Sequence, residues 1–505
     1  MALRSEAILS FRRFRRQPFL RFFLSVFRQR QWYDVEQSWY ERQLLVVVVE
    51  LGNEWPQLEL QFGRRESSEQ QQSVQRFNRA SCSEFWHSYR IIISTQHQII
   101  QDSMAYQLTK EALLLDLYAA FHSAKRHKSN RLYVKTFERR LDANLRKLCD
   151  ELWSHRYVPE PSSCFIVEHP KKREVFAAQF RDRVVHHLYY NYTHKLLEST
   201  FIQDSYSCID GRGTHYGIDR MRKHILQESD NYQRKCYVLK LDIRGYFMHI
   251  NRQTLLDITI GTLRKMASHK VDGCGEERWD DVLDMDFIEW LTGEIVMLNP
   301  KEHCHIVWSR KDWIGLDRNK SLFYTDEGCG LPIGNLTSQL LSNVYMNDYD
   351  QFMKRELHCR HYGRYVDDSY VVSHDREWLL SLVPKVRDYL KENLGLDLHM
   401  GKVQVMEVKN GVEFLGAYIK PYRTYMSHAS IHRAVRKIER LDISDKDKAW
   451  RSLNSFLGVF AHFTSYNIRC RVFLKPRLMS VGIYNRSITK MEKVSTYFNP
   501  HSINI

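Results

Sequence analysis

The chain has no lysine among its first 109 residues, although arginine is frequent there and lysine is common from Lys110 onward. This break suggests that residues 1–103 and the remainder have different origins. Three interpretations stay open for residues 1–103: an organelle transit peptide or basic amphipathic helix, a nucleic-acid-binding extension, or upstream sequence translated from an early start codon ahead of Met104. The segment has no consistent hydrophobic period, so we expect an extension that is non-essential or disordered.

Paired cysteines and long apolar runs are also lacking. The ten cysteines include no CxxC pair and follow no regular spacing, which argues against a disulfide framework or a zinc ribbon and favours a reducing compartment. No apolar stretch reaches the roughly 18 residues that a membrane-spanning helix needs. We therefore expect a soluble protein with no membrane partner.

Positive charge, in contrast, is in excess. The 75 Lys and Arg residues outnumber the 60 Asp and Glu residues, which gives a formal net charge of +15. The 43% of hydrophobic residues and 27% of charged residues are typical of a folded globular protein. A basic folded chain favours a polyanionic partner, and nucleic acid is the first candidate.

The hydrophobic pattern predicts helices at both ends of the remaining chain. Apolar residues recur at three- and four-residue spacing from Leu113 to Leu152, and residues 183–200 continue this helical pattern. Between these stretches, Pro170 to Arg173 indicates a basic hairpin. The tail from His428 onward is again basic and helical in pattern.

The middle of the chain predicts strands that carry three carboxylates. Residues 236–243 alternate as a strand that reaches Asp242, and residues 362–373 predict a hairpin with its turn at Asp367 and Asp368. Adjacent carboxylates repel each other, so such a turn is stable only if it is solvated or neutralised by cations. A solvated turn is the simpler interpretation of the pair alone. Three carboxylates from two adjacent strands can instead hold two divalent ions, which activate a hydroxyl and stabilise a leaving pyrophosphate.

Four segments, in this order and spacing, resemble the motifs of the reverse transcriptases. They are Leu241 to Phe247 (motif A), Gly330 to Gln339 (motif B), Tyr365 to Asp368 (motif C) and Gly411 to Gly416 (the primer grip). The resemblance extends from about residue 115 to about residue 465. It implies an α+β right-hand polymerase with fingers at 104–235, a palm with an antiparallel sheet at 236–425 and a helical thumb at 426–505. Residues 261–325 form an insertion between motifs A and B, to which the sequence assigns no role.

Motif B departs from the usual pattern of the family. That pattern is Gln-Gly, three residues, then Ser-Pro, whereas this chain has Ile333 and Gly334, three residues, then Ser338 and Gln339. Together with the segment Arg173 to His187, the variant resembles the reverse transcriptases of diversity-generating retroelements. These bacterial and phage systems copy a template RNA with frequent errors opposite adenine and require a small basic accessory protein. The resemblance implies that partner and a cytoplasmic location in a bacterial or phage host, with organelle targeting as the alternative.

The resemblance also implies a role for individual residues. Asp242, Asp367 and Asp368 are the expected catalytic metal ligands, with the Ile243 carbonyl as a backbone ligand and Lys402 as the donor of a proton to pyrophosphate. The expected nucleotide-binding residues are Arg173, Arg181, Tyr246, Phe247, Ile333, Gly334 and Gln339, and the primer grip includes Phe414, Leu415 and Gly416. The implied cofactor is a pair of Mg²⁺ ions, for which Mn²⁺ can substitute. The implied substrates are an RNA template, a DNA or RNA primer and dNTPs.

Some of these roles have alternatives. Tyr246 is expected under the incoming sugar, where its ring excludes a 2′-hydroxyl, but it could be a core aromatic with Phe247 as the gate. Gly334 is expected to let the backbone approach the template base. Ile333 stands where a Gln amide would align the nucleotide, although it could simply pack the turn. Lys402 could be a plain surface lysine.

Two other functions compete with this interpretation. One is a group II intron-like or defence-associated reverse transcriptase, which shares the chemistry. The other is a maturase-like RNA-binding protein that no longer polymerises. The three intact aspartates argue against the second, since a protein relieved of catalysis has no reason to keep carboxylates that repel one another.

Overall fold

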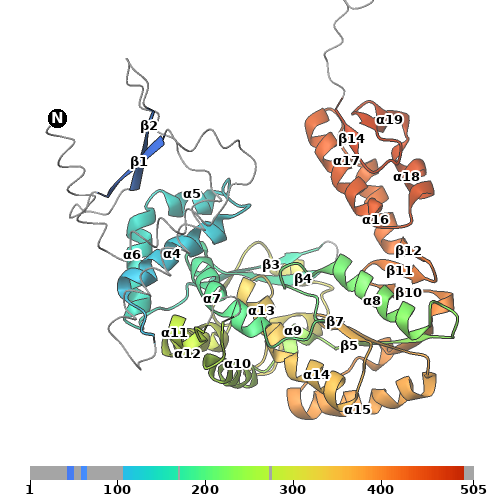
Figure 1. The fold of residues 1–505 in the computed structure, drawn as a ribbon, viewed down its shortest axis with the longest axis horizontal. Helices are drawn as coiled ribbons and strands as arrows, with labels where there is room; N and C mark the ends of the chain where they lie inside the picture. The colour runs from blue at the N-terminus through green and yellow to red at the C-terminus, as the bar shows by residue number, and fades with distance from the viewer. Residues whose placement is uncertain (1–42, 50–57, 65–105, 169–170, 272–275, 494–505) are drawn as a thin grey trace, which may run out of the picture. The chain divides into compact units, whose positions relative to one another are not determined.

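The computed structural model describes residues 43–49, 58–64, 106–168, 171–271 and 276–493. The chain divides into two units, residues 1–91 and 92–505. In the first unit, β1 (Gln43–Val49) and β2 (Leu58–Arg64) form an antiparallel pair (Figure 1). The other residues of the predicted 1–103 extension lie outside the described residues, so the expectation for that segment stays a prediction.

The segment predicted as fingers consists of helices around a small sheet. Its elements are α4 (Lys110–Lys125), α5 (Leu132–Glu138), α6 (Leu141–Trp153), β3 (Ser162–Val167), β4 (Arg173–Ala177) and α7 (Phe180–Glu198). Helix α4 begins where the Thr109 hydroxyl accepts a hydrogen bond from the Ala112 amide. Strands β3 and β4 pair antiparallel, which confirms the predicted basic hairpin.

The insertion at 261–325 joins this same part of the fold. It spans the end of α10 (Arg252–Ala267), then α11 (Trp279–Val282), α12 (Met285–Met297), β6 (Cys304–Ile306) and 3₁₀ turns at Arg310–Trp313, Arg318–Lys320 and Leu322–Tyr324. Strand β6 runs parallel to β3, which gives the sheet order β4-β3-β6. The Thr292 hydroxyl of α12 donates to the Tyr189 hydroxyl of α7 at 3.1 Å. The insertion therefore adds a third strand to the sheet of β3 and β4, and its helix α12 contacts α7.

A four-stranded antiparallel sheet forms the centre of the segment predicted as palm. Its order is β7 (Tyr362–Tyr365), β8 (Asp368–Ser373), β5 (Tyr237–Asp242) and β9 (Gln404–Glu407). The predicted strand and hairpin are confirmed, with one correction. Asp368 already pairs within β8, so the turn consists of Val366 and Asp367 and comes one residue earlier than expected.

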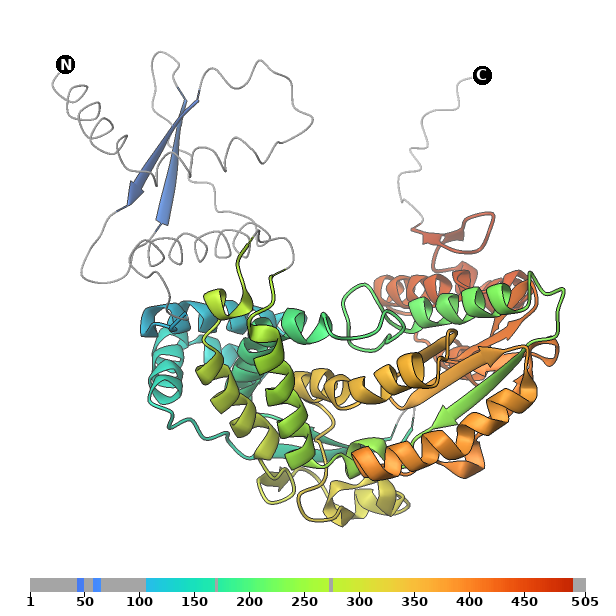
Figure 2. The same cartoon turned by 60° about the horizontal axis from the view of Figure 1, so that its bottom comes forward.

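Helices cover both faces of this sheet. Helix α8 (Thr214–Glu228) lies on one side of β5, and α15 (Arg376–Leu394) lies on the other (Figure 2). Val238 packs in the core beneath α8, whereas Leu239 and Leu241 pack in the larger core. That core also includes α13 (Leu336–Tyr345), α14 (Asn347–Gln351), the π-helix Phe352–Glu356 and the short α9 (Tyr246–His249). Successive side chains of β5 therefore face two different cores, in agreement with the alternation that predicted this strand.

The C-terminal region has a core of its own. The strands β10 (Val412–Phe414), β11 (Ala417–Lys420) and β12 (Arg423–Met426) lead into α16 (His428–Glu439), α17 (Lys446–Ala461), α18 (Tyr466–Phe473), α19 (Pro476–Met479) and the hairpin of β13 (Ile483–Tyr484) and β14 (Met491–Glu492). Leu453, Leu457 and Phe460 of α17 are fully buried there. The observed α+β class, with antiparallel sheets and a helical C-terminal region, is the predicted one. None of the helices in the described residues combines the length and apolar character needed to cross a bilayer.

Candidate active site

The three predicted catalytic aspartates meet at one end of the palm sheet. Strand β5 ends at Asp242 and β8 begins at Asp368, and these two residues stand directly opposite each other in the antiparallel register. Asp367 occupies the turn immediately before β8. The side chains of Asp242 and Asp368 are 22% and 29% exposed, so solvent reaches both. The geometry thus gathers the three carboxylates that the sequence singled out.

These carboxylates carry more negative charge than the protein balances. Burial, followed by the charge of Asp242, raises the pKa of Asp367 to about 6. Burial also raises the pKa of Asp368, although the ammonium group of Lys240, 3.7 Å from Asp368 Oδ1, acts in the opposite direction. Lys402 Nζ donates to Asp242 Oδ2 at 2.6 Å. The two lysines reduce the repulsion without removing it.

The donor set fits hard divalent cations that are partly supplied with ligands by the substrate. Among the residues that the structure describes, no group of three or more His, Cys, Asp or Glu side chains is arranged as a ready metal cage. Mg²⁺ does not require one, because it is usually held by one or two carboxylates and completes its shell with water and substrate phosphates. The raised pKa values of Asp367 and Asp368 reflect negative charge that such a cation would neutralise.

The Tyr246 side chain of motif A is enclosed by the core. The ring is 3% exposed, and its hydroxyl donates to the Ser342 carbonyl of α13 at 2.5 Å. A side chain enclosed in this way favours the alternative in which Tyr246 is a core aromatic residue, and its position under the incoming sugar stays a prediction. The neighbouring Phe247 is only partly buried and lies edge-on to Tyr246, with ring centroids 5.2 Å apart. Phe247 is thus the better placed of the two candidate gates. Next to Asp242, the backbone of Ile243 forms an isolated antiparallel β-bridge with Leu398.

Motif B docks on the fingers hairpin. The Phe176 amide of β4 donates to the Ile333 carbonyl at 2.9 Å, and the Ile333 side chain packs against the small core around Phe176. Gly334 has a φ of +131°, and a Cβ there would lie 2.8 Å from the Phe176 carbonyl oxygen. Contact with β4 therefore requires a glycine here, and the expected approach to a template base stays a prediction. Gln339 is exposed, and its Oε1 accepts from Cys208 Sγ at 3.4 Å.

The two predicted arginines have different surroundings. Arg173 is exposed at the start of β4. Arg181 is 18% exposed, and its guanidinium group forms ion pairs with Glu151 and with Asp182 at 3.3 Å, in addition to a 3.1 Å hydrogen bond to the Val158 carbonyl. Arg181 is therefore held at the base of α7, whereas the guanidinium group of Arg173 has no hydrogen-bond partner among the residues that the structure describes.

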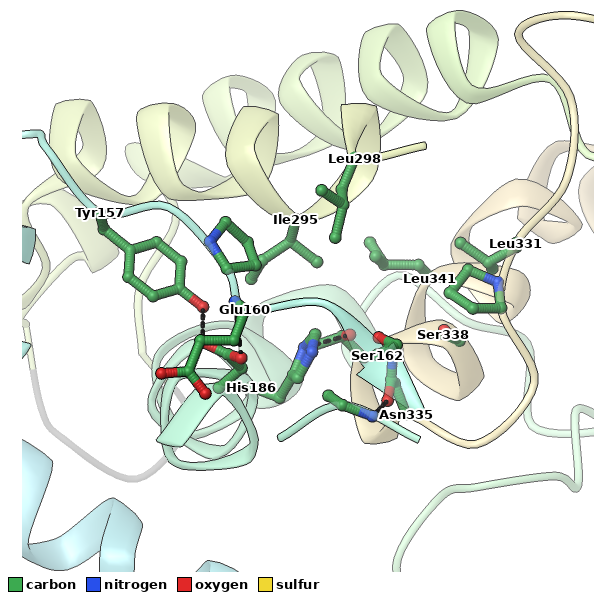
Figure 3. A pocket seen from close by; sticks show the side chains of 15 residues that line it. Tyr157, Glu160, Ser162, His186, Ile295, Leu298, Leu331, Asn335, Ser338 and Leu341 are labelled. Atoms are coloured by element: carbon green, nitrogen blue, oxygen red, sulfur yellow. Dashed lines mark hydrogen bonds between the residues drawn. The ribbon is translucent and has the colours of Figure 1, made fainter. Parts of the chain in front are cut away.

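A pocket lies between α7, α12 and the start of α13 (Figure 3). Some of its polar groups are hydrogen-bonded to each other: Tyr157 donates to Asp182 at 2.9 Å, and Thr337 and His186 Nδ1 are 2.8 Å apart. Burial raises the pKa of Asp182 to about 6 and lowers that of His186 to about 4. None of the three aspartates predicted to be catalytic is among the residues that line it.

The predicted primer grip forms the turn between β10 and β11. Phe414 is fully buried and meets Tyr370 of β8 edge-on at 5.0 Å. Leu415 and Gly416 turn the chain with φ values of +48° and +82°. The turn is therefore anchored to the palm sheet through Phe414.

Sequence reasoning missed two supporting residues. Glu174 of β4 is 1% exposed and accepts hydrogen bonds from the Ser321 hydroxyl and the Leu322 amide, both at 2.7 Å, which ties the insertion to the fingers. Lys240 lies beside Asp368. The alternation of β5 places Lys240 on the face of Asp242, and that pattern could have identified it.

Comparison with known families finds a match for one segment of the chain. Residues 289–419 match the family model for Reverse transcriptase (RNA-dependent DNA polymerase). The matched range includes Gly334, Asp367, Asp368 and Lys402, and Asp242 precedes it. The match covers less than half of the chain, and it agrees with the predicted enzyme class, an RNA-directed DNA polymerase. The diversity-generating lineage stays a prediction.

Individual relatives are distant. Protein YkfC of Escherichia coli (strain K12) is 23% identical over 335 residues, which cover 60% of this chain and 74% of that protein. Apo telomerase from Candida tropicalis is 12% identical, with 64% of this chain and 57% of that chain covered and a TM-score of 0.38. Telomerase from Candida albicans with a telomeric RNA fragment is 11% identical, covering 64% and 55%, with a TM-score of 0.37. The chain spans little more than half of these telomerases, and the fold assignment rests on its own elements.

Proposed function

We propose that the chain copies an RNA template into DNA at the site formed by Asp242, Asp367 and Asp368, with two Mg²⁺ ions as cofactor and Mn²⁺ as a substitute. The observation that carries the proposal is the meeting of these carboxylates at the paired ends of β5 and β8, with raised pKa values at Asp367 and Asp368. Bound there, divalent ions would activate the primer 3′-hydroxyl and neutralise charge on the leaving pyrophosphate.

The residues around the carboxylates have complementary roles in this proposal. The sheet backbone fixes Asp242 and Asp368, so neither needs to be ordered when substrate binds. Lys402 has a flexible, 57% exposed side chain that can leave Asp242 and give a proton to pyrophosphate. The exposed Arg173 offers a guanidinium fork to the triphosphate, and Phe247 restricts the space beside the sugar. The other substrates are an RNA template, a DNA or RNA primer and dNTPs.

The test is extension of a primed RNA by the purified full-length chain with dNTPs and Mg²⁺. We expect Asp367→Asn and Asp242→Asn to abolish extension and to leave RNA binding nearly unchanged, because phosphate contacts dominate affinity. Asp388→Asn, which changes a 52% exposed carboxylate of α15, is the matched control and should be fully active. Substantial extension by either site variant would refute the metal site. A wild-type chain that binds RNA without extending a primer would favour the maturase-like alternative.

A narrower proposal concerns fidelity. The aliphatic Ile333 stands where a Gln amide would hold the nucleotide in one alignment, and we propose that the chain is an error-prone enzyme of a diversity-generating retroelement. A small basic accessory protein and a cytoplasmic bacterial or phage host belong to the same proposal. The packing of Ile333 against the core around Phe176 supports the simpler alternative, in which it only seats the turn.

Sequencing of cDNA made from a defined RNA separates these possibilities. Ile333→Gln should lower errors opposite template adenine by about tenfold, because a restored polar contact is worth roughly 1–2 kcal/mol of discrimination. Ile333→Leu, which keeps the packing, is the control and should keep the wild-type spectrum. An active Ile333→Gln variant with unchanged errors would favour a group II intron-like or defence-associated enzyme.

A further inference from the structure

The side chain of Arg364 lies in the palm core, two residues before the motif C turn. It is 1% exposed, and it forms a bidentate pair with the equally buried Asp350 of α14: Nε donates to Oδ1 and Nη2 to Oδ2, both at 2.7 Å. The Tyr362 hydroxyl also donates to Asp350, at 2.6 Å. The cost of removing two charges from water offsets much of their attraction, so stability alone is a poor reason for such a pair.

The remaining donors of Arg364 point to another reason. Nη1 donates to the Val366 carbonyl at 2.9 Å and to Asn343 Oδ1 at 3.2 Å, and Nη2 also donates to Ser205 Oγ at 3.4 Å. A guanidinium group has five N–H donors, and each of them has an acceptor here. Lysine has three donors on a single nitrogen and cannot reproduce this planar arrangement.

Val366, whose carbonyl Arg364 holds, has a strained backbone. Its φ is +58°, in the left-handed region that β-branched residues rarely adopt. It is also the residue immediately before Asp367, so its peptide group sets the direction in which Asp367 leaves the turn. A strained residue stays in place only when its surroundings fix it, and the hydrogen bond from Arg364 is a contact that does so.

We propose that Arg364 is a positioning residue that holds the motif C turn in the conformation that presents Asp367 to the metal ions. Asp350 fixes the guanidinium group, and the group fixes the Val366 carbonyl. Asn343 and Asp350 lie on α13 and α14, so the same contacts link the turn to the helix that begins within motif B and to the helix after it. The proposal rests on the proposed polymerase function.

The first test compares Arg364→Lys with the wild type in single-turnover primer extension over a range of Mg²⁺ concentrations. We expect the rate to fall at least about tenfold, and the Mg²⁺ concentration for half-maximal rate to rise several-fold, because a misplaced ligand weakens metal binding. The matched control is Arg220→Lys, since Arg220 donates to Asp204 at 2.7 Å and has no hydrogen bond to the turn. This control should lower the melting temperature without changing the Mg²⁺ requirement.

Adding Val366→Gly to Arg364→Lys should recover at least about threefold in rate, because glycine adopts the left-handed conformation without support. The double variant Asp350→Leu/Arg364→Met covers the case in which Arg364→Lys does not fold, because apolar replacement of a buried pair is often tolerated. This double variant should fold, extend the primer slowly and need a higher Mg²⁺ concentration for its half-maximal rate. Folded variants with wild-type rate and Mg²⁺ requirement would overturn the proposal, and so would slow variants with an unchanged requirement and no recovery. An inactive wild type would instead refute the polymerase function itself.

Discussion

Asp367→Asn should make the metal-free protein more stable while it destroys activity. Burial and the charge of Asp242 raise the pKa of Asp367 from 3.8 to about 6. A shift of about two units corresponds to about 3 kcal/mol between the two protonation states. Because the side chain is partly exposed, we discount this to about 1–2 kcal/mol for the ionised form. An amide removes this cost, and a chain of this size would then gain roughly 1–4 °C in melting temperature.

The effect has a defined pH dependence. A carboxylate whose pKa is raised by folding contributes stability that is fully present below its unfolded pKa, near 4, and lost as the pH rises through about 6. The advantage of Asp367→Asn should therefore be absent near pH 4, appear between pH 4 and 6, and be complete above about pH 7. Mg²⁺ should reverse the order of the two melting temperatures. Metal binding stabilises the folded wild type, and it stabilises the variant less because the variant lacks this ligand.

Thermal unfolding at pH 4, 6 and 8, in EDTA and in Mg²⁺, tests this reasoning. The control is Asp388→Asn, which removes an exposed carboxylate and should follow the wild type in every condition. An Asp367→Asn protein that melts at or below the wild-type temperature in EDTA at pH 8 would refute the electrostatic argument. It would mean that hydrogen bonds to the carboxylate outweigh the repulsion.

Three further outcomes follow from the site geometry. Phe247→Ala should raise ribonucleotide incorporation by about tenfold or more in competition with dNTPs, whereas a folded Tyr246→Ala variant, which also loses its ring, should leave the ratio unchanged; the reverse result would restore Tyr246 as the gate. Gly334→Ala should cost about 1–3 kcal/mol in unfolding experiments, because its methyl group meets the backbone of β4, and unchanged stability would contradict that close contact. Lys402→Met should tighten Mn²⁺ binding up to about fivefold by freeing Asp242 and slow nucleotide addition roughly 10–100-fold. Unchanged single-turnover rates would leave Lys402 as a plain surface lysine.

The parts of the site that depend on local pattern could be predicted from the sequence. The alternation of residues 236–243 and the hairpin at 362–373 fix which residues share a face, and antiparallel pairing then brings Asp242 and Asp368 together. The position of the turn was wrong by one residue, because no local signal indicates that Val366 adopts a left-handed conformation. Helix α7 also follows its periodic pattern closely.

The parts that depend on distant pairing could not be predicted. Tyr246 and Phe247 are adjacent aromatic residues, and only the hydrogen bond to Ser342, 96 residues away, shows which of them is in the core. Gly334 contacts Phe176 across the boundary between palm and fingers. The motif spacing predicts a glycine at position 334, but it does not indicate which part of the chain a side chain there would collide with.

Lys402, which pairs with Asp242, and Arg364, which holds the turn before Asp367, differ in burial, and this difference suits different tasks. Lys402 is 57% exposed, so its ion pair with Asp242 is weak and can be exchanged for a metal ion at little cost. Arg364 is 1% exposed and satisfied at every donor, so releasing it would leave buried charges unpaired. In the proposed function, the site takes up and releases metal and pyrophosphate in every cycle and needs the first kind of cation beside Asp242. It needs the second kind behind Asp367, where movement would misplace the ligand.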